Sequence, residues 1–227
     1  MPESPKQLIT TSDGSHTLFV PQLNEHYHST FGALTESRHV YLQAGFESLT
    51  GKQEVSVFEV GFGTGLNALL TCLSSVEKGV HTTYYTIESD PLEEEFTGKL
   101  NYGDLLPGKL KPAELFASIH QAPWDKTVNI HPDFSLHKIH ASLIGYRPDF
   151  SYDLLYYDAF APDKQPGMWS PELFGTLFEK MNPGGILVTY CVKGEVKSML
   201  RQAGFEIEKL PGPPGKREIL RGRKLMA

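Results

Sequence analysis

The chain has 227 residues, of which 40% are hydrophobic and 21% are charged; this is the balance of a globular domain and not of a disordered chain. It has no apolar run long enough to span a membrane and no export signal at its N-terminus, and its two cysteines lie in apolar runs, as thiols do in a reducing compartment. We therefore expect a cytoplasmic protein with no membrane partner; the oligomeric state is left open.

The charge is distributed unevenly along the chain. The formal net charge of −6 argues against a nucleic-acid partner. The segment Lys193–Lys224, however, contains nine basic residues and four glutamates, so it carries +5 and leaves −11 for the remainder. Such a basic edge can bind a phosphate backbone, or it can be the solvated face of a strand and a helix.

Residues 1–50 are predicted to form a small N-terminal extension. Gln7–Thr11 and His16–Val20 flank the dipeptide Asp13-Gly14, which is a strong signal for a β-hairpin. The stretch Glu25–Leu42 has the pattern of a loop that enters a helix.

Residues 51–227 alternate between strand and helix patterns. This alternation predicts a mostly parallel, doubly wound α/β sheet, and a closing strand–loop–strand unit predicts one antiparallel edge strand. The expected strands are Val55–Val60, His81–Glu88, Thr127–Ile130, Leu136–His140, Tyr152–Asp158, Ile186–Val192, Phe205–Leu210 and Glu218–Arg221. The expected helices are Leu66–Val76, one opened by Pro91, Ala113–Gln121, Pro171–Met181 and Val196–Ala203.

A glycine-rich turn follows the first parallel strand and opens the next helix. Its glycines, Gly61, Gly63 and Gly65, let the backbone bend sharply and approach a ligand closely. Glu59 would repel the pyrophosphate of a dinucleotide, whereas it is compatible with the ammonium and sulfonium of S-adenosylmethionine. Glu88 ends the next strand, where a carboxylate can accept hydrogen bonds from both ribose hydroxyls. The turn therefore predicts a site for S-adenosylmethionine.

The chain resembles the class I S-adenosylmethionine-dependent methyltransferases from about Val55 onward, through the motifs EVGFGTGLN and MNPGGILVTY. The resemblance implies a Rossmann-like fold with a seven-stranded, mostly parallel sheet whose last strand is antiparallel. It adds Phe62 and Asn67 to the expected cofactor contacts. Many members carry an acidic residue at the end of the third strand for the adenine; here only Ser142 is available.

The acceptor is expected beside Asp158, at the end of the fourth parallel strand. A carboxylate next to Phe160, Pro162 and Trp169 suits an amine in an apolar, partly dehydrated site. The two aromatic side chains could stack on a splayed-out base, although both are also compatible with a core position. The alternative for the aspartate is that it caps the turn after the strand.

Four segments together are similar to the MnmC-like family, called MnmD when the methyltransferase stands alone, which completes 5-methylaminomethyl-2-thiouridine at the tRNA wobble position. They are EVGFGTGLN, DAFAPDKQPGMW, GKREIL and, near the N-terminus, HSTFGALTESRHVYL. The resemblance implies methyl transfer to the aminomethyl nitrogen, with Asp158 orienting the amine and taking its proton. Lys216 and Arg217 are the candidates for phosphates near the anticodon. Because the chain ends at Ala227 without a second glycine-rich fingerprint, the fused FAD oxidase is expected to be absent.

Two other functions compete with this prediction. A methyl- or aminopropyltransferase acting on a small amine would share the fold and the aspartate, but it would not need a basic edge. A non-catalytic protein that binds an adenosine ligand would bind the cofactor without transferring its methyl group. No metal site is expected, because the histidine pair His26-x-His28 has neither cysteine near it in sequence.

Overall fold

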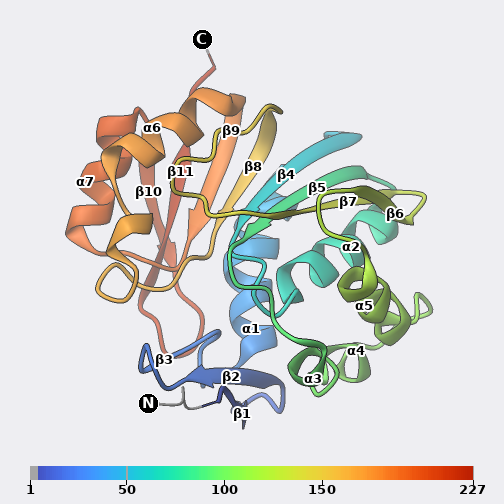
Figure 1. The fold of residues 1–227 in the computed structure, drawn as a ribbon. Helices are drawn as coiled ribbons and strands as arrows, with labels where there is room; N and C mark the ends of the chain where they lie inside the picture. The colour runs from blue at the N-terminus through green and yellow to red at the C-terminus, as the bar shows by residue number, and fades with distance from the viewer. Residues whose placement is uncertain (1–4, 50, 227) are drawn as a thin grey trace.

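The structure, a computed structural model, describes residues 5–49 and 51–226. Two sheets are present in this part of the chain: a three-stranded antiparallel sheet near the N-terminus and an eight-stranded central sheet. Figure 1 shows the small sheet lying across one end of the central sheet, with helices on both faces of the latter.

The N-terminal sheet contains the predicted hairpin. Strands β1 (Gln7–Thr10) and β2 (His16–Val20) pair antiparallel, and a short β3 (Glu25–His26) pairs with β2. The turn residue Asp13 also accepts a hydrogen bond from the backbone N–H of Thr35 at 2.9 Å. This bond lies in the first turn of the following helix, so the hairpin turn and the helix stabilise each other.

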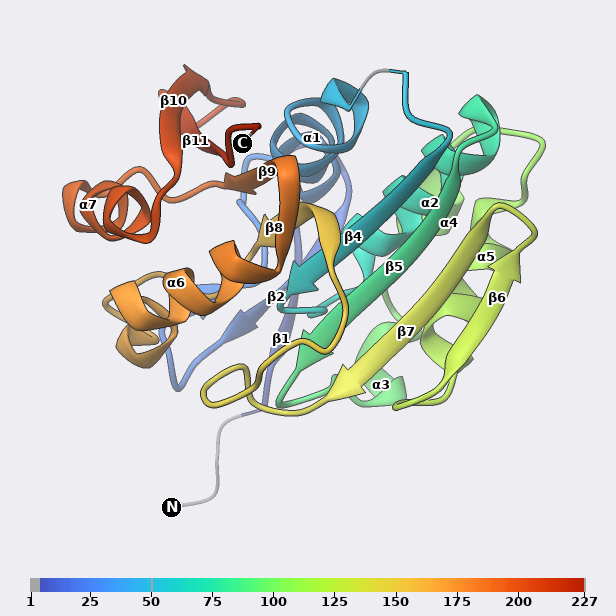
Figure 2. The same ribbon diagram turned by 90° about the horizontal axis from the view of Figure 1, so that it is seen from above.

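The predicted helix after the hairpin is short and irregular. It begins as α1 (Ala33–Ser37), continues as a π-helical segment, η1 (Arg38–Gln43), and is followed by a 3₁₀ turn, η2 (Phe46–Ser48). Figure 2 shows this helix on the same face of the central sheet as α2 (Leu66–Lys78). Ala33, Leu34, Val40 and Tyr41 are buried there, which fixes the extension to the sheet.

The central sheet has the strand order β10-β11-β9-β8-β4-β5-β7-β6. Its strands are β4 (Glu54–Val60), β5 (His81–Glu88), β6 (Thr127–His131), β7 (Phe134–His140), β8 (Tyr152–Tyr157), β9 (Met181–Thr189), β10 (Glu206–Pro211) and β11 (Glu218–Arg223). Strands β7, β5, β4, β8 and β9 are parallel, as predicted.

The sheet has the eight strands that the residue pattern predicts, one more than the resemblance implies, because β6 forms a hairpin with β7 and adds an antiparallel strand at that edge. As predicted, the last strand of the chain, β11, is antiparallel to its neighbour β9. At the other edge the antiparallel strand is β11, which lies between β9 and β10 and therefore is not itself an edge strand. In the closing hairpin, the second strand, β11, therefore pairs with β9, and the first strand, β10, forms the edge of the sheet.

Helices cover the two faces of the central sheet and create two separate cores. Leu69 of α2, Ile119 of α5 and Val57 belong to one core, and Phe174 of α6, Leu200 of α7 and Tyr157 belong to the other. The helices are α2 (Leu66–Lys78), α3 (Glu94–Thr97), α4 (Tyr102–Leu105), α5 (Pro112–Gln121), α6 (Pro171–Lys180) and α7 (Gly194–Ala203), with a 3₁₀ turn at η3 (Pro166–Met168). Over the described ranges, no helix has both the length and the hydrophobicity to cross a membrane.

Candidate active site

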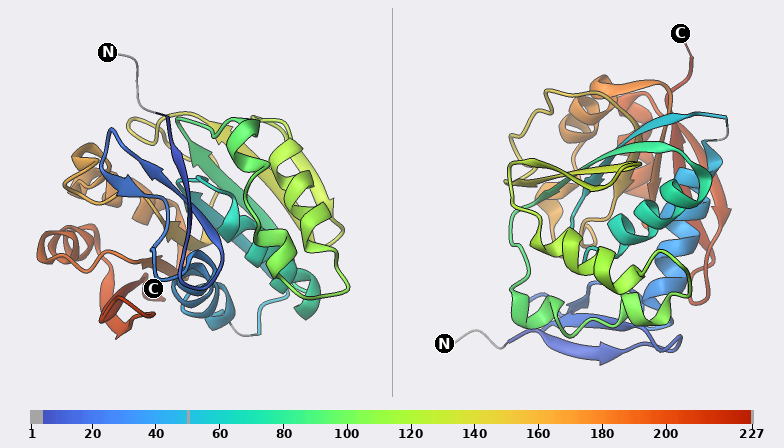
Figure 3. Two further views of the ribbon diagram at one scale, coloured as in Figure 1. Left: turned by 90° about the horizontal axis from the view of Figure 1, so that it is seen from below. Right: turned by 90° about the vertical axis from the view of Figure 1, so that its right-hand side faces the viewer.

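A cavity of about 400 Å³ lies between the carboxyl ends of the parallel strands and the N-terminal sheet. Figure 3 shows the N-terminal sheet covering this end of the central sheet. Gly61, Glu88 and Asp158, which follow or end β4, β5 and β8, line one side of the cavity, while Val20 and Tyr27 line the other. The N-terminal extension is therefore a wall of the site, and not only an appendage.

The glycine-rich turn forms part of the cavity wall. Gly61 and Gly63 both line the cavity and have positive φ angles of 89° and 49°. A Cβ on Gly61 would lie 2.9 Å from the carbonyl oxygen of Asp158, and one on Gly63 would lie 3.0 Å from the ring of Tyr27. Gly65, with φ of 73°, is the N-cap of α2, and among the described residues it is not one that lines the cavity. The first two glycines thus keep side chains out of the space that a ligand would use.

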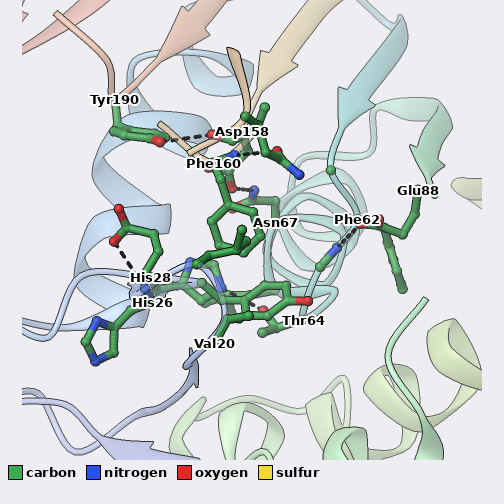
Figure 4. Close-up of a pocket in the computed structure, with 18 of the residues that line it drawn as sticks. Val20, His26, His28, Phe62, Thr64, Asn67, Glu88, Asp158, Phe160 and Tyr190 are labelled. Atoms are coloured by element: carbon green, nitrogen blue, oxygen red, sulfur yellow. Dashed lines mark hydrogen bonds between the residues drawn. The ribbon is translucent and has the colours of Figure 1, made fainter. Parts of the chain in front are cut away.

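Glu88 lies where the sequence predicts the ribose carboxylate. Its Oε2 accepts the backbone N–H of Gly63 at 3.1 Å, and its Oε1 accepts those of Ser89 and Asp90 at 2.8 and 2.9 Å. Burial raises the pKa of this carboxyl group, while the three N–H groups oppose that rise. The carboxylate is therefore fixed against the glycine turn and faces the cavity, as Figure 4 shows.

Glu59 does not occupy the position that we predicted for it. Because neighbouring strand residues point to opposite faces, its side chain lies under α2, near Tyr84, Thr86 and Asn67, and does not line the cavity. It is fully buried, and burial raises the pKa of its carboxyl group to about 8. A carboxyl group that is neutral at pH 7 and enclosed in the core is a structural part of the turn. It is not a partner for the cofactor's positive charge.

Two further predicted cofactor contacts differ from expectation in the structure. Ser142 is exposed, and its hydroxyl accepts the backbone N–H of Ile144 at 3.1 Å; its neighbours Ala141 and Leu143 line the cavity instead. Phe62 lines the cavity but is only 4% exposed, since its ring packs against the rings of His120 and Trp124. The part of the cavity wall that follows the third parallel strand, β7, is thus apolar.

Asp158 lies at the opposite end of the cavity and is held by two buried donors. The hydroxyl of Tyr41 donates to its Oδ1 at 2.5 Å, and the amide of Asn67 donates to its Oδ2 at 2.9 Å. Burial raises the pKa of the Asp158 carboxyl group to about 7, although both donors oppose that rise. No hydrogen bond from a backbone N–H to this carboxylate is present within the described residues, so the turn-cap alternative has no support.

Of the three apolar residues predicted beside the acceptor, one reaches the cavity. Phe160 lines it, with its ring in edge-to-face contact with Tyr27 at 5.1 Å between centroids. Trp169 is only 4% exposed; its indole N–H donates to the carbonyl of Phe160 at 2.8 Å and its ring packs on Tyr157. Pro162 is also buried. Trp169 therefore helps to hold the backbone of Phe160 in place, and its buried ring has no free face on which a base could stack.

The acceptor end contains a cluster that the sequence did not reveal. Lys216 turns into the cavity, where its ammonium lies 2.6 Å from a carboxylate oxygen of Glu36 and 4.0 Å from the centre of the Tyr190 ring. Tyr190 in turn donates from its hydroxyl to the carbonyl of Ala159 at 2.9 Å. The predicted phosphate contact for Lys216 is therefore not supported, because its charge is already paired inside the site. The segment HSTFGALTESRHVYL, which contains Glu36 and Tyr41, was the available signal for this cluster.

The basic C-terminal edge is largely neutralised by ion pairs. Arg221 binds Glu208 at 2.7 Å, and Arg223 lies 3.7 Å from the same carboxylate. Lys209 pairs with Glu218 at 2.9 Å. Arg217 is exposed, and across residues 5–49 and 51–226 it takes part in no ion pair. It is the member of the predicted pair that remains available to an anionic partner.

His28, one of the histidines considered for a metal, has a structural contact instead. Its Nε2 lies 2.6 Å from the hydroxyl of Thr64, and burial lowers the pKa of its imidazole to about 4. In the described part of the chain, no group of three or more potential metal ligands is present. The hydrogen bond between His28 and Thr64 therefore links the N-terminal wall of the cavity to the glycine turn.

Comparisons with known proteins show similarity to methyltransferases in sequence and fold. The profile of a family described as S-adenosyl-L-methionine-dependent methyltransferase matches residues 120–225. Two curated relatives are each the "tRNA 5-methylaminomethyl-2-thiouridine biosynthesis bifunctional protein MnmC". The protein of Azoarcus sp. (strain BH72) is 30% identical over 99% of this chain and 36% of its own length. That of Cupriavidus metallidurans is 30% identical over 95% of this chain and 33% of its own. The chain thus spans about a third of the length of these relatives.

Solved structures show the same fold. The crystal structure of MNMC2 from Aquifex aeolicus superposes with a TM-score of 0.81 at 23% identity, covering 100% of this chain and 72% of that one. Spermidine synthase from Thermotoga maritima superposes with a TM-score of 0.55 at 12% identity, covering 98% and 73%. The chain is therefore similar to S-adenosyl-L-methionine-dependent methyltransferases over residues 120–225 and to about a third of each MnmC relative, and it shares its fold with MNMC2.

Proposed function

We propose that this protein transfers the methyl group of S-adenosylmethionine to the aminomethyl nitrogen of 5-aminomethyl-2-thiouridine at the tRNA wobble position. The observation that carries the proposal is the place of Asp158. Its carboxylate lines the same cavity as Gly61 and Gly63, and it stands beside Phe160 and Tyr190. The name of the MnmC relatives states a product, 5-methylaminomethyl-2-thiouridine in tRNA, and the proposed substrate is that nucleoside without its methyl group.

The cavity residues fit S-adenosylmethionine. Its volume of about 400 Å³ lies within the range of small-molecule sites. The Glu88 carboxylate would accept the ribose hydroxyls, while Gly61 and Gly63 leave the backbone accessible to the ligand. When bound, S-adenosylmethionine supplies a methyl group on a positively charged sulfur, which a neutral amine can attack.

Asp158 has two tasks in this proposal. It orients the amine by accepting a hydrogen bond from one of its N–H groups, and it takes the proton that the nitrogen loses as the new C–N bond forms and the methyl–sulfur bond breaks to leave a neutral thioether. An ionised carboxylate also favours the unreactive ammonium form of the amine. Loss of water in the cavity opposes this effect, because desolvation disfavours the charged form of an amine.

The nucleic acid is proposed to approach over the loop between β10 and β11. Arg217 on this loop is exposed and unpaired among the described residues, so it can contact a phosphate. Phe31 lies at the rim of the cavity with 55% of its surface exposed, next to Gly215 of the same loop. Both positions suit a single-stranded anticodon loop whose target base enters the cavity. A tRNA substrate also places the enzyme in the cytoplasm.

Transfer of labelled methyl groups tests the proposal. The protein is incubated with labelled S-adenosylmethionine and either tRNA carrying aminomethyluridine, the same tRNA without it, or small primary amines including putrescine. We expect label only in the modified tRNA, on the nucleoside released by digestion. Label in the small amines alone would replace the proposal by a small-amine transferase, and cofactor binding without any transfer would indicate a non-catalytic binding protein.

A further inference from the structure

The buried surroundings of Asp158 include two side chains from outside its own strand end, one of which, Asn67, is the last residue of the glycine-rich motif and also lines the cavity. Tyr41 comes from η1 in the N-terminal extension, and Asn67 comes from the first turn of α2. They are only 2% and 4% exposed. Both are therefore fixed in the protein before any substrate arrives.

Each donor takes a different oxygen of the carboxylate. Tyr41 donates to Oδ1 at 2.5 Å and Asn67 donates to Oδ2 at 2.9 Å. A carboxylate held at both oxygens cannot rotate about its Cβ–Cγ bond without breaking a buried hydrogen bond. The lone pairs that remain free are then directed by the protein.

Tyr41 is suited to be a permanent donor in this arrangement. Burial and the nearby Asp158 charge raise the pKa of its phenol well above the ordinary value, so it stays protonated. Its ring packs against Tyr156 at 5.3 Å between centroids, and this contact limits its movement. It does not line the cavity, so its effect on an acceptor must pass through Asp158.

Resting on the proposed function, we infer that Tyr41 and Asn67 are positioning residues that hold Asp158 with one lone pair directed at the acceptor amine and keep its carboxylate ionised. The N-terminal extension thereby supplies part of the acceptor site's acid–base machinery. A hydrogen bond to the charged form favours that form, which is the second effect of the two donors.

Other charged and titratable groups also face Asp158. They are Glu36 and Tyr41 from the N-terminal extension, Glu59 from β4, Tyr84 from β5, Tyr190 after β9 and Lys216 from the loop between β10 and β11. Among these, Tyr41 makes a direct hydrogen bond to the carboxylate. Removing the Tyr41 hydroxyl therefore distinguishes the effect of this hydrogen bond on Asp158 from the electrostatic effect of the other charged groups nearby.

The test compares Tyr41→Phe with Tyr156→Phe, a buried tyrosine that packs on the same ring but whose hydroxyl meets Thr71 at 3.2 Å. Turnover of modified tRNA is measured against pH, and cofactor affinity is measured by calorimetry. For Tyr41→Phe we expect kcat to fall about tenfold or more, the loss of one hydrogen bond to a charged group. The acidic limb of the pH profile should move to higher pH, because an Asp158 that has lost its donor ionises less readily. Cofactor affinity and the profile of Tyr156→Phe should match the parent.

Asp158→Asn and the double variant Asp158→Asn with Tyr41→Phe distinguish a failure of the positioning inference from a failure of the proposed function. If positioning is correct, Tyr41→Phe adds no further loss once Asp158 is replaced. An inactive Asp158→Asn together with an unshifted Tyr41→Phe profile would overturn the inference and leave the proposed function intact. A fully active Asp158→Asn would overturn the proposed role of the aspartate itself.

Asn67→Asp provides a second route if Tyr41→Phe does not fold. It has the same shape, but it replaces the donor with a second carboxyl group beside Asp158. We expect a larger upward shift of the acidic limb than for Tyr41→Phe, because a like charge disfavours the ionised form. An unshifted profile in a folded Asn67→Asp would contradict the inference.

Discussion

The glycine turn and the Glu88 carboxylate at the cofactor end of the cavity come from one continuous stretch, residues 54–88, where a strand, a turn, a helix and a second strand follow in order. The acceptor end takes Asp158 from the residue after β8, Tyr41 from the N-terminal extension and Lys216 from the loop between β10 and β11. A local motif is sufficient to identify the first end. The second end depends on how distant segments pack together, and it carries the features specific to the acceptor.

This difference predicts that variants of the two ends separate cofactor affinity from methyl transfer. Changes near the glycine turn should act on cofactor binding, whereas changes around Asp158 should act on turnover.

Gly63→Val should abolish cofactor binding. A valine would need the disfavoured φ of 49°, and its Cβ would lie 3.0 Å from the Tyr27 ring, so the turn and the cavity wall would both have to move. Calorimetry with S-adenosylmethionine measures the affinity. The matched control is Gly79→Val, at φ of 62° but with open space around it, which should bind the cofactor normally. Normal binding by Gly63→Val would remove the glycine turn from the site.

Glu88→Gln should weaken cofactor binding about tenfold, equivalent to roughly 1–2 kcal/mol for a hydrogen bond to a charged group. The amide cannot accept from Gly63, Ser89 and Asp90 and also serve the ribose as the carboxylate does. The same calorimetric titration checks this. An unchanged dissociation constant would move the ribose contact to another residue.

Arg217→Ala should weaken tRNA binding only a few-fold and lower its dependence on salt by about one phosphate contact. Arg217 is exposed and has no ion partner within the described residues, in contrast to Arg221. Filter binding at several salt concentrations measures the slope. Arg201→Ala on α7 removes the same charge from another surface and serves as the control. Equal slopes in both variants would show that tRNA does not use this loop.

Glu59→Gln should leave cofactor affinity almost unchanged but alter the pH dependence of stability. The folded-state pKa of about 8 lies above the ordinary value of 4.5, so the folded protein binds the extra proton between these limits. The contribution of Glu59 to the free energy of unfolding is therefore present at low pH and is lost as the pH rises toward about 8.

Denaturant unfolding from pH 5 to 9 measures the effect of the glutamine. The free energy of unfolding of the parent should fall by on the order of 3 kcal/mol toward the alkaline end of that range, and the variant should not show this fall. A large drop in cofactor affinity would instead restore Glu59 as a direct contact.

Much of the fold could be predicted because its signals are local. The Asp13-Gly14 hairpin, the glycine turn and helix α5 all follow from turn chemistry or periodicity in one segment. The order of the closing strands could not be predicted in this way, since nothing local to β10 or β11 specifies which one pairs with β9. The division into residues 1–50 and 51–227 stays a prediction.

The candidate site was predictable to a similar extent. Asp158 and Glu88 could be placed because strand ends meet at one edge of a parallel sheet. Trp169 could not be distinguished from a base-stacking residue, because burial is decided by its contact with Phe160 and not by its neighbours in sequence. The ion pair of Lys216 could not be predicted for the same reason, because its partner Glu36 lies in the opposite half of the chain.

The most direct test of this account is Asp158→Asn, measured by turnover with modified tRNA and by calorimetry with the cofactor. The asparagine keeps the size of the side chain but loses the base, so turnover should fall on the order of 100-fold or more while cofactor affinity stays within error. The parent rate should rise through about pH 7, where the buried carboxyl group ionises. The residual rate of the variant should continue to rise at higher pH with the free amine. Equal turnover with an unaltered pH profile would contradict the account and leave the acceptor end without a base.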